Sequence, residues 1–499
     1  METLESLLYG FSVALQPNHL FFCFIGCLLG TLVGVLPGLG PVAAISMLLP
    51  VTFQVESTSA IIMLAGIYYG AMYGGTTTSV LVNVPGEAAS VVTCLDGYQM
   101  AKQGRAGAAL GIAAFGSFIA GTVGLVGLLV IAKPLSSLAL QFGPPEYLAI
   151  ILVGFTFVTY LTQGSMLKGV IMACLGLMLS MVGLDPINSQ ERMTFGVLNL
   201  FEGLGIAPIT MGLFGFSEVL LNLESTSSSQ VVTTKVKDLL PSRRDWLQAR
   251  WALLRGTIIG FFMGILPGGG PVLATFISYG VEKRVAKDPS RFGKGAIEGV
   301  AAPEAANNAA ASTSFIPLLT VGIPPNVILA VLFGAFLIHG ILPGPFLITE
   351  HPDVFWGVVS SMYIGNVMLL VMNLPMIPLW VQILKIPDRF LYPLILLFCL
   401  IGAYSINNAV FDVGVMVAFG IFGYLLKKFG YEGAPLILAF VLGPMFEINL
   451  RRSLLMSQGS FAIFFTRPIA VVALLVCLSL VGLSIYQFLT QRKKGVEPY

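Results

Sequence analysis

A polar face within an apolar segment is the part of this sequence best suited to chemistry. In "PEAANNAAASTS", residues 303–314, Glu304, Asn307, Asn308 and Ser312 recur at intervals of three and four and share one helical face. Carboxylate and carboxamide groups are costly inside a membrane unless they meet partners, water or a ligand. The face therefore predicts one wall of a polar binding site, although hydrogen bonding between packed membrane helices would also account for it.

Hydroxyl groups extend this polar segment and recur in the first half of the chain. Ser312, Thr313 and Ser314 resemble Thr77, Thr78 and Ser79 of "YYGAMYGGTTTSVLVNVPG", residues 68–86, in which Asn83 stands just before a Pro-Gly break. Hydroxyls and backbone N–H groups can hold carboxylates without a buried Lys or Arg. We therefore expect these side chains and Asn83 to contact substrate, with hydrogen bonds between helices as the structural alternative.

Glu304 has three possible roles. It can bind a coupling cation, carry a proton, or cap a helix behind Pro303. A carboxylate that faces an anionic substrate repels it unless the carboxylate is protonated or paired with a cation. We favour coupling to Na⁺ or H⁺ and predict no resident metal and no cofactor.

Two helix breaks must position these groups. "GVLPGLGP" at 34–41 and "GILPGGGP" at 264–271 interrupt apolar segments with glycine and proline. Free backbone groups cost several kcal/mol each in lipid, so such breaks persist only where they line a cavity or are buried in protein. Helix ends offer N–H or C=O groups to ions, and glycine permits close approach. The predicted backbone contacts with substrate are at Gly38, Gly40, Gly268 and Gly270.

Composition places the whole chain in a membrane. Of 499 residues, 56% are hydrophobic and 10% are charged, and the mean hydropathy is +0.89. Soluble domains are about a quarter charged, so we predict an all-α, multi-pass membrane protein with about twelve transmembrane helices. The six cysteines show no disulfide or zinc spacing. No nucleic-acid partner is predicted, and the lipid bilayer is the expected surroundings.

The sequence predicts that the chain consists of two repeats. Each half has the Leu-Pro-Gly-x-Gly-Pro break followed about 40 residues later by a small, polar segment, and a shift of 235 residues aligns Thr77–Ser79 with Ser312–Ser314. Paired breaks at corresponding positions are typical of transporters with binding sites between repeats. The predicted divisions are an N-terminal membrane repeat at 1–223, a cytoplasmic linker at 224–250, a C-terminal repeat at 251–466, and a final transmembrane helix with a cytoplasmic tail at 467–499.

Basic residues indicate that the repeats are inverted. Residues 1–101 contain no Lys or Arg, whereas eleven basic residues surround the break at 264–271, six between 235 and 255 and five between 283 and 294. Basic loops stay in the cytoplasm, so the segment 251–282 would enter and leave on one side as a re-entrant hairpin, and its counterpart at 19–53 would open on the other side. A single kinked spanning helix is the alternative. Lys102, Arg105 and Lys294 either set this topology or attract an anion.

Longer motifs resemble a known family across essentially the whole chain. The two Pro-Gly breaks, "DGYQMAKQGRAGAALG" at 96–111 and "FGKGAIEGVAAPEAANNAAASTSFIPLLTVGIPPN" at 292–326 are similar to the large membrane subunit of bacterial tripartite tricarboxylate transporters. The last motif is long and specific, whereas the short breaks alone would be a weak signal.

The resemblance implies a permease of the bacterial inner membrane. Such a permease works with a small membrane subunit of about four helices and a periplasmic solute-binding protein. It takes up tricarboxylates or related carboxylates, with citrate as the default, and it is driven by an ion gradient. The loaded transport unit would then expose its site inward by elevator-like translation or by rocking.

Other functional classes make different predictions. "EGVAAPEAANN" superficially resembles the coupling loop of an ATP-driven importer's permease, but it continues directly into an apolar segment. A membrane-embedded enzyme would usually carry acidic or His clusters for metal or acid–base chemistry, and the sequence shows none. A passive channel can also contain broken helices, but it would not give saturable flux. We therefore expect a transporter and no enzyme activity.

Overall fold

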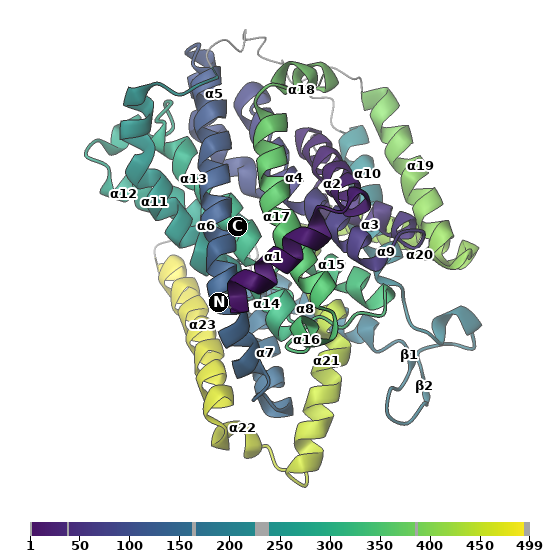
Figure 1. Cartoon of the computed structure of the whole chain (residues 1–499). Coiled ribbons are helices and arrows are strands. Elements are labelled where there is room, and N and C mark those ends of the chain that lie inside the picture. The colour runs from purple at the N-terminus through teal and green to yellow at the C-terminus, as the bar shows by residue number, and fades with distance from the viewer. Residues whose placement is uncertain (1, 37–38, 162–165, 225–238, 385–387, 494–499) are drawn as a thin grey trace.

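The computed structural model describes residues 2–36, 39–161, 166–224, 239–384 and 388–493. Helices dominate these ranges (Figure 1). The elements before residue 225 are α1 (Glu2–Ala14), α2 (Pro17–Val35), α3 (Pro41–Thr52), α4 (Ser57–Val82), η1 (Ala88–Ser90), α5 (Val91–Lys102), α6 (Ala106–Ala139), α7 (Pro144–Leu161), α8 (Met166–Ser180), β1 (Gly183–Leu184), β2 (Glu191–Arg192), η2 (Leu198–Leu200), α9 (Ile206–Thr210), the π-helical turn η3 (Met211–Phe216) and α10 (Ser217–Glu224).

The elements after residue 238 are helices. They are α11 (Arg243–Ile265), α12 (Gly270–Val285), η4 (Pro289–Arg291), α13 (Glu298–Thr313), α14 (Phe315–Val321), α15 (Val327–Ile338), α16 (Leu347–Glu350), α17 (Pro352–Asn373), α18 (Ile377–Ile383), α19 (Asp388–Asn407), α20 (Val410–Lys428), α21 (Ala434–Met456), α22 (Ile463–Thr466) and α23 (Pro468–Lys493).

The described helices fit a multi-pass membrane protein. Seven of them are long and apolar enough to cross a membrane, and five shorter apolar helices of 10–17 residues accompany them. The all-α class is confirmed, apart from one antiparallel strand pair that joins Gly183 to Arg192 and Leu184 to Glu191. The number of about twelve membrane crossings stays a prediction.

Glycines bring α2 into direct backbone contact with α4. A Cβ added at Gly26, Gly30 or Gly34 would lie 2.2–2.5 Å from a carbonyl oxygen of α4, contributed in turn by Met63, Ile67 and Ala71. The glycines recur every four residues and their partners do too, so the two helices run parallel. Small residues at this spacing are the usual means of close helix packing in membranes.

The same arrangement occurs between α11 and α13. A Cβ added at Gly256, Gly260 or Gly264 would lie 2.3–2.4 Å from a carbonyl oxygen of α13, contributed in turn by Ala302, Ala306 and Ala310. These helices are also parallel. In both halves, therefore, the first arm of the broken segment packs along the helix that carries the polar residues.

The second break forms a helical hairpin. Arg255 on α11 binds Glu282 on α12 through two contacts of 2.5 and 2.8 Å. Arg255 lies ten residues before the end of α11, and Glu282 lies twelve residues after the start of α12. The two arms are therefore antiparallel and lie side by side (Figure 1). This geometry agrees with the predicted hairpin and not with a single kinked helix.

The first break also turns back on itself. The start of α2 meets the start of α4 through a 2.7 Å hydrogen bond between His19 and Ser59. Because α3 ends at Thr52, only five residues before α4 begins, α3 must return toward the start of α2. Pro37 and Gly38, at the tip of this break, lie outside the described residues.

The last part of the predicted linker is helical. Helix α11 begins at Arg243, inside the range 224–250, because Ser242 and Asp245 form a reciprocal capping box. Residues 225–238, the centre of the predicted linker, lie outside the described residues, as does the predicted cytoplasmic tail from 494 onward.

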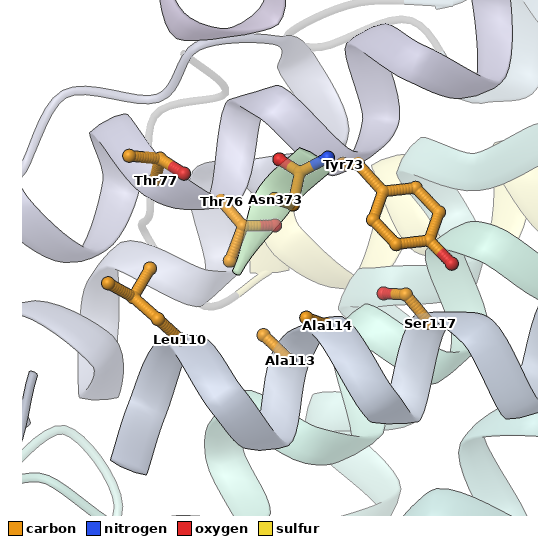
Figure 2. Close-up of a pocket in the computed structure, with 8 residues that line it drawn as sticks. All are labelled: Tyr73, Thr76, Thr77, Leu110, Ala113, Ala114, Ser117 and Asn373. Atoms are coloured by element: carbon orange, nitrogen blue, oxygen red, sulfur yellow. The ribbon is translucent and has the colours of Figure 1, made fainter. Parts of the chain in front are cut away.

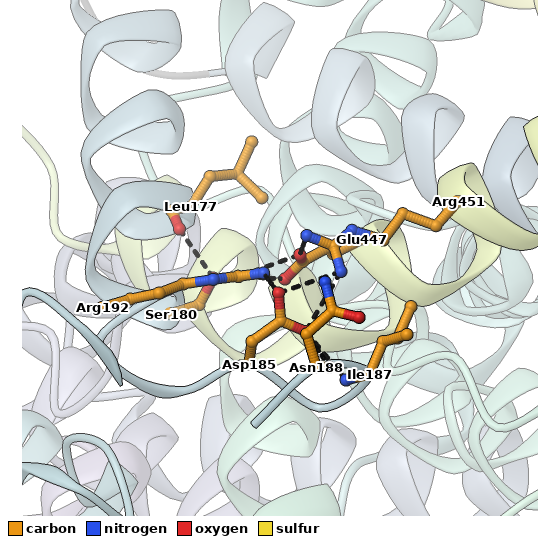
Figure 3. Close-up of polar contacts among 8 residues, drawn as sticks. All are labelled: Leu177, Ser180, Asp185, Ile187, Asn188, Arg192, Glu447 and Arg451. Carbon is orange, nitrogen blue, oxygen red and sulfur yellow. Dashed lines mark hydrogen bonds and ion pairs between the residues drawn. The ribbon is translucent and has the colours of Figure 1, made fainter. Parts of the chain in front are cut away.

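An ion-pair cluster fastens the loop between α8 and α9 to α21 (Figure 3). Asp185 contacts Arg192 and lies 3.1 Å from Arg451, while Glu447 lies 2.9 Å from Arg192 and 3.0 Å from Arg451. A backbone hydrogen bond from Ile187, together with the two arginines, lowers the pKa of Asp185 below its usual value. The acidic and basic side chains of this cluster form ion pairs with one another, which agrees with a structural role for Glu447.

We expect Gly260→Ala to destabilise the protein by about 1–3 kcal/mol, because its methyl group would press on the Ala306 carbonyl. Gly280→Ala is the matched control, since a Cβ at that helical glycine meets nothing within 4 Å; it should be neutral or stabilising by roughly 0.5–1 kcal/mol. Thermal unfolding of the purified chain in detergent measures both. Equal stability of the two variants would contradict the close packing of α11 on α13.

Candidate functional site

Glu304 lies at the centre of a buried polar cluster. Its side chain on α13 is 1% exposed. Thr93 of α5 donates to Glu304 Oε1 at 2.5 Å, and Thr76 of α4 donates to Oε2 at 2.7 Å. Ser117 of α6 is 3.5 Å from the Glu304 backbone oxygen. The carboxylate therefore connects the polar helix of the second half to α4 and α5 of the first, and the backbone oxygen of Glu304 adds a contact with α6.

The two predicted asparagines extend this cluster along α13. Asn308 donates to Ser117 at 2.6 Å and to the Glu304 carbonyl at 3.2 Å. Asn307 donates to Glu87 Oε1 at 3.4 Å, and its own Oδ1 is buried without a hydrogen-bond partner. The residues predicted to share one helical face therefore lie on α13, and this face packs against other helices of the protein.

Glu87 is a second buried carboxylate, and the sequence analysis missed it. It is 7% exposed and caps η1 by accepting from the Ala89 N–H at 2.5 Å. A signal was present in the sequence, because "VNVPGE" at 82–87 matches "VGIPPN" at 321–326. The aligned segments end in Glu87 and Asn326, both of which cap the next helix with their side chains.

The two turns also match in backbone geometry. Asn83 ends α4 in the left-handed conformation with φ 59°, and Gly322 ends α14 with φ 81°. Asn83 and Gly322 are 239 positions apart, as are Glu87 and Asn326. The turns of the two halves therefore align at a shift of 239 residues, whereas the shift inferred from the hydroxyl residues is 235 and that of the Pro-Gly breaks is 230.

Each turn contacts the polar helix of the opposite half. Glu87 meets Asn307, and Asn326 meets Tyr68 of α4, whose hydroxyl is 3.2 Å from Nδ2. Tyr68 and Asn307 are also 239 positions apart. The contact between Glu87 and Asn307 therefore corresponds to the contact between Asn326 and Tyr68, with the roles of the two halves reversed. Thr76 lies against Glu304 and Tyr68 against Phe315, so α4 runs antiparallel to α13 and α14.

The described residues place no countercharge in this cluster. Among the described residues, no ion pair involves Glu304 or Glu87. An ionised carboxylate buried without a partner is strongly unfavourable. A proton or a cation at each carboxylate would remove this cost.

Most of the predicted hydroxyl groups serve the helices themselves. Thr78 donates to the Val35 carbonyl at 2.7 Å, Ser79 to Gly75, and Thr313 to Ala309. Ser314 donates to Ala310 and lies 3.3 Å from Asn326 Nδ2. Ser312 is buried against Gly124. Of this set, Thr77 lines a cavity beside Glu304.

Two of the glycines predicted to contact substrate, Gly268 and Gly270, lie at the tip of the α11–α12 hairpin. Gly268 has φ 80° and donates its N–H to the Pro325 carbonyl at 2.7 Å, while Gly270 begins α12 with φ 66° and approaches Asn326. The tip of α11–α12 thus touches the turn before α15. Gly40 caps α3 with nothing within 4 Å of its Cβ position, and Gly38 lies outside the described residues. Asn83 is exposed and ends α4.

Asp96 anchors the start of α13. Its Oδ1 accepts from the Gly295 and Ala296 N–H groups, both at 2.8 Å, and Tyr279 of α12 donates to Oδ2 at 3.0 Å. The aspartate of the "DGYQMAKQGRAG" motif therefore holds α5, α12 and α13 together. This explains why an acidic residue begins that motif.

A small cavity adjoins Glu304 between α4, α6 and α17 (Figure 2). The space open to a water-sized sphere is about 10 Å³, which is room for about one water molecule. A tricarboxylate does not fit. Its lining residues are Tyr73, Thr76, Thr77, Leu110, Ala113, Ala114, Ser117 and Asn373.

Helices and site together define a multi-pass membrane protein with a buried polar centre. Residues 20–438 match the Tripartite tricarboxylate transporter TctA family, and the chain belongs to this family. The predicted resemblance is thereby confirmed. The chain is a membrane protein of a transporter family whose tripartite systems have further components.

Two proteins of Agrobacterium vitis are similar to the chain. One, described as an uncharacterized 52.8 kDa protein in the TAR-I ttuC' 3' region, is 50% identical over 496 residues, which cover 99% of both chains. The other, an uncharacterized protein in the TAR-II ttuC' 3' region, is 56% identical over 211 residues, which cover 42% of this chain and 87% of that protein. No solved structure matches the chain.

We predict that Glu304→Leu destabilises the protein by roughly 1–3 kcal/mol, because Thr76 and Thr93 would lose their buried acceptor. Glu304→Gln should cost less, since one amide oxygen can still accept and the hydroxyls can rotate to accept from the amide nitrogen. Thermal unfolding in detergent measures both losses. A leucine variant as stable as the glutamine variant would contradict the hydrogen-bonded role of Glu304.

Proposed function

We propose that this chain is the permease subunit of a secondary-active transporter that takes up tricarboxylates or related carboxylates. Citrate is the first substrate to test. Family membership supports the substrate class, and the buried site supports coupling to an ion. The chain itself has no catalytic role in this proposal.

A single observation carries the coupling. Glu304 is buried between the two halves of the chain, bound by hydroxyl groups of α4 and α5, and without a cationic partner among the described residues. Such a group changes its energy strongly when it gains or loses Na⁺ or H⁺. It can therefore bind the coupling ion and link that ion to the arrangement of the helices.

Substrate binds at the hairpin tip and the neighbouring turn in the proposal. The hairpin tip at Gly268 and Gly270 lies against the turn at Asn326, and glycine at the tip allows a ligand to approach the backbone closely. A cation near Glu304 would offset the charge of a carboxylate substrate. The ion and the substrate would then cross the low-dielectric interior with less net charge than the substrate alone.

The two halves act as inverted repeats in this account. Matching glycine packing, matching turns 239 residues apart and the antiparallel course of α4 against α13 support it. The repeats 1–223 and 251–466 would enclose the site, and one would rock or translate against the other to expose it on either side.

Basic loops indicate the cytoplasmic face. Arg105 binds Asp245 at 2.5 Å, and Gln103 donates to the Lys294 carbonyl at 2.8 Å. Three loops that carry basic residues therefore meet at one end of the helix bundle, as the positive-inside rule would require of a cytoplasmic end. We infer a location in the bacterial inner membrane, with a small four-helix membrane subunit and a periplasmic solute-binding protein as partners.

Uptake by reconstituted protein tests the proposal. Proteoliposomes that contain this chain and its small membrane subunit receive the binding protein and labelled citrate outside, with an inward sodium gradient or an inward proton gradient and no ATP. We expect saturable accumulation under at least one gradient, and none when both are absent. Other tricarboxylates and dicarboxylates follow in the same assay.

The controls separate the competing classes. Accumulation that needs ATP inside the vesicles would show an ATP-driven importer. Gradient-independent, non-saturable flux would show a channel. Asp412→Asn is the matched variant, because this acid is bonded to Asn407 outside the polar cluster and should leave uptake unchanged.

A further inference from the structure

We propose that the small cavity beside Glu304 is a binding site for one monovalent metal cation of the size of Na⁺, with Asn373 of α17 as a ligand. This inference rests on the proposed function and names the chemistry of its coupling ion. Four observations lead to it: an orphaned oxygen, the direction of the neighbouring hydroxyl groups, the size of the cavity and the sparse charge of the site.

Asn373 has a buried oxygen that no protein donor satisfies. The side chain is 5% exposed, its Nδ2 donates to the Leu369 carbonyl at 3.0 Å, and its Oδ1 has no hydrogen-bond partner. Asn373 lines the cavity next to Thr76 (Figure 2). Because orphaned buried oxygens are costly, this one indicates a missing donor or cation.

The surrounding hydroxyl groups present oxygen lone pairs as well. Thr76 uses its hydrogen on Glu304 Oε2. Ser117 directs its hydrogen to the Glu304 backbone oxygen and already accepts from Asn308. A hydroxyl has one hydrogen and two lone pairs, so both groups can only accept from a ligand in the cavity.

A cation suits this set of acceptors better than a water molecule does. Water donates two hydrogens, whereas Thr76, Ser117 and Asn373 already offer three acceptors, and Thr77 adds another hydroxyl oxygen to the lining. A metal cation accepts electron pairs from all of them at once. Carbonyl and hydroxyl oxygens are ligands that hard cations prefer.

Size and charge restrict the cation to a small monovalent ion. The cavity has room for about one water-sized particle. Among the described residues, Glu304 is the only one whose carboxylate contacts a hydroxyl group that lines the cavity. The described residues also contain no group of three or more His, Cys, Asp or Glu that could hold a metal ion. One negative charge and neutral oxygens balance a single positive charge. A bound ion would then hold α4, α6 and α17 together beside Glu304.

Direct cation binding to the purified full-length chain tests the site without substrate or partners. The midpoint of thermal unfolding is measured against NaCl concentration, with choline chloride keeping the ionic strength constant. We expect a saturable rise with Na⁺ and a weaker response to K⁺, because binding to the folded state alone raises its stability.

Three variants assign the ligands. Asn373→Leu removes the orphaned oxygen at similar size, and Thr76→Val removes a hydroxyl at similar size. Each should raise the apparent Na⁺ dissociation constant at least tenfold. Ser361→Ala is the control, because this buried hydroxyl on α17 bonds to its own helix at Val358 and does not line the cavity; its Na⁺ response should match the wild type.

The outcomes separate this inference from the proposed function. No Na⁺-specific stabilisation of the wild type, or an unchanged response in both cavity variants, would overturn the cation site even if a proton gradient drives uptake. Na⁺ binding that the variants abolish would support the site. If uptake then proved independent of every ion gradient, the proposed function would fail while the site remained.

Discussion

Close backbone contact between parallel helices is the constraint on which the rest of this structure depends. Three glycines on α2 and three on α11 allow each helix to touch the carbonyl groups of the helix that carries the polar residues. Without that approach, the arms of each broken segment could not pack along α4 and α13.

From this packing follows the meeting of two turns at one polar centre. Glu87 contacts Asn307 and Asn326 contacts Tyr68, so each half places its turn against the other half's polar helix. The two turns differ in charge, because one ends in a carboxylate and the other in an amide. Glu304 lies nearby with its hydroxyl donors. A centre built this way is acidic and rich in oxygen, which is the chemistry that the proposed ion site requires.

Much of this arrangement is predictable from sequence, but its central contacts are not. The apolar composition, the paired breaks and the polar face of Glu304, Asn307 and Asn308 are local patterns, and the structure places these three side chains together on α13. Thr93, Ser117 and Asn373 came from separate helices without any motif, and only tertiary packing brings them to Glu304 or its cavity. Thr78 and Ser79 look the same in sequence as ligands would, yet they bond to backbone.

The most direct test of ion coupling at Glu304 compares two modes of transport in the Glu304→Gln variant. Proteoliposomes with the complete transporter are assayed for gradient-driven accumulation of the carboxylate and for exchange of labelled against unlabelled carboxylate at equal concentrations. If Glu304 holds the coupling ion, the variant should lose accumulation while it retains exchange that no longer depends on the ion. Accumulation at the wild-type level would contradict the account.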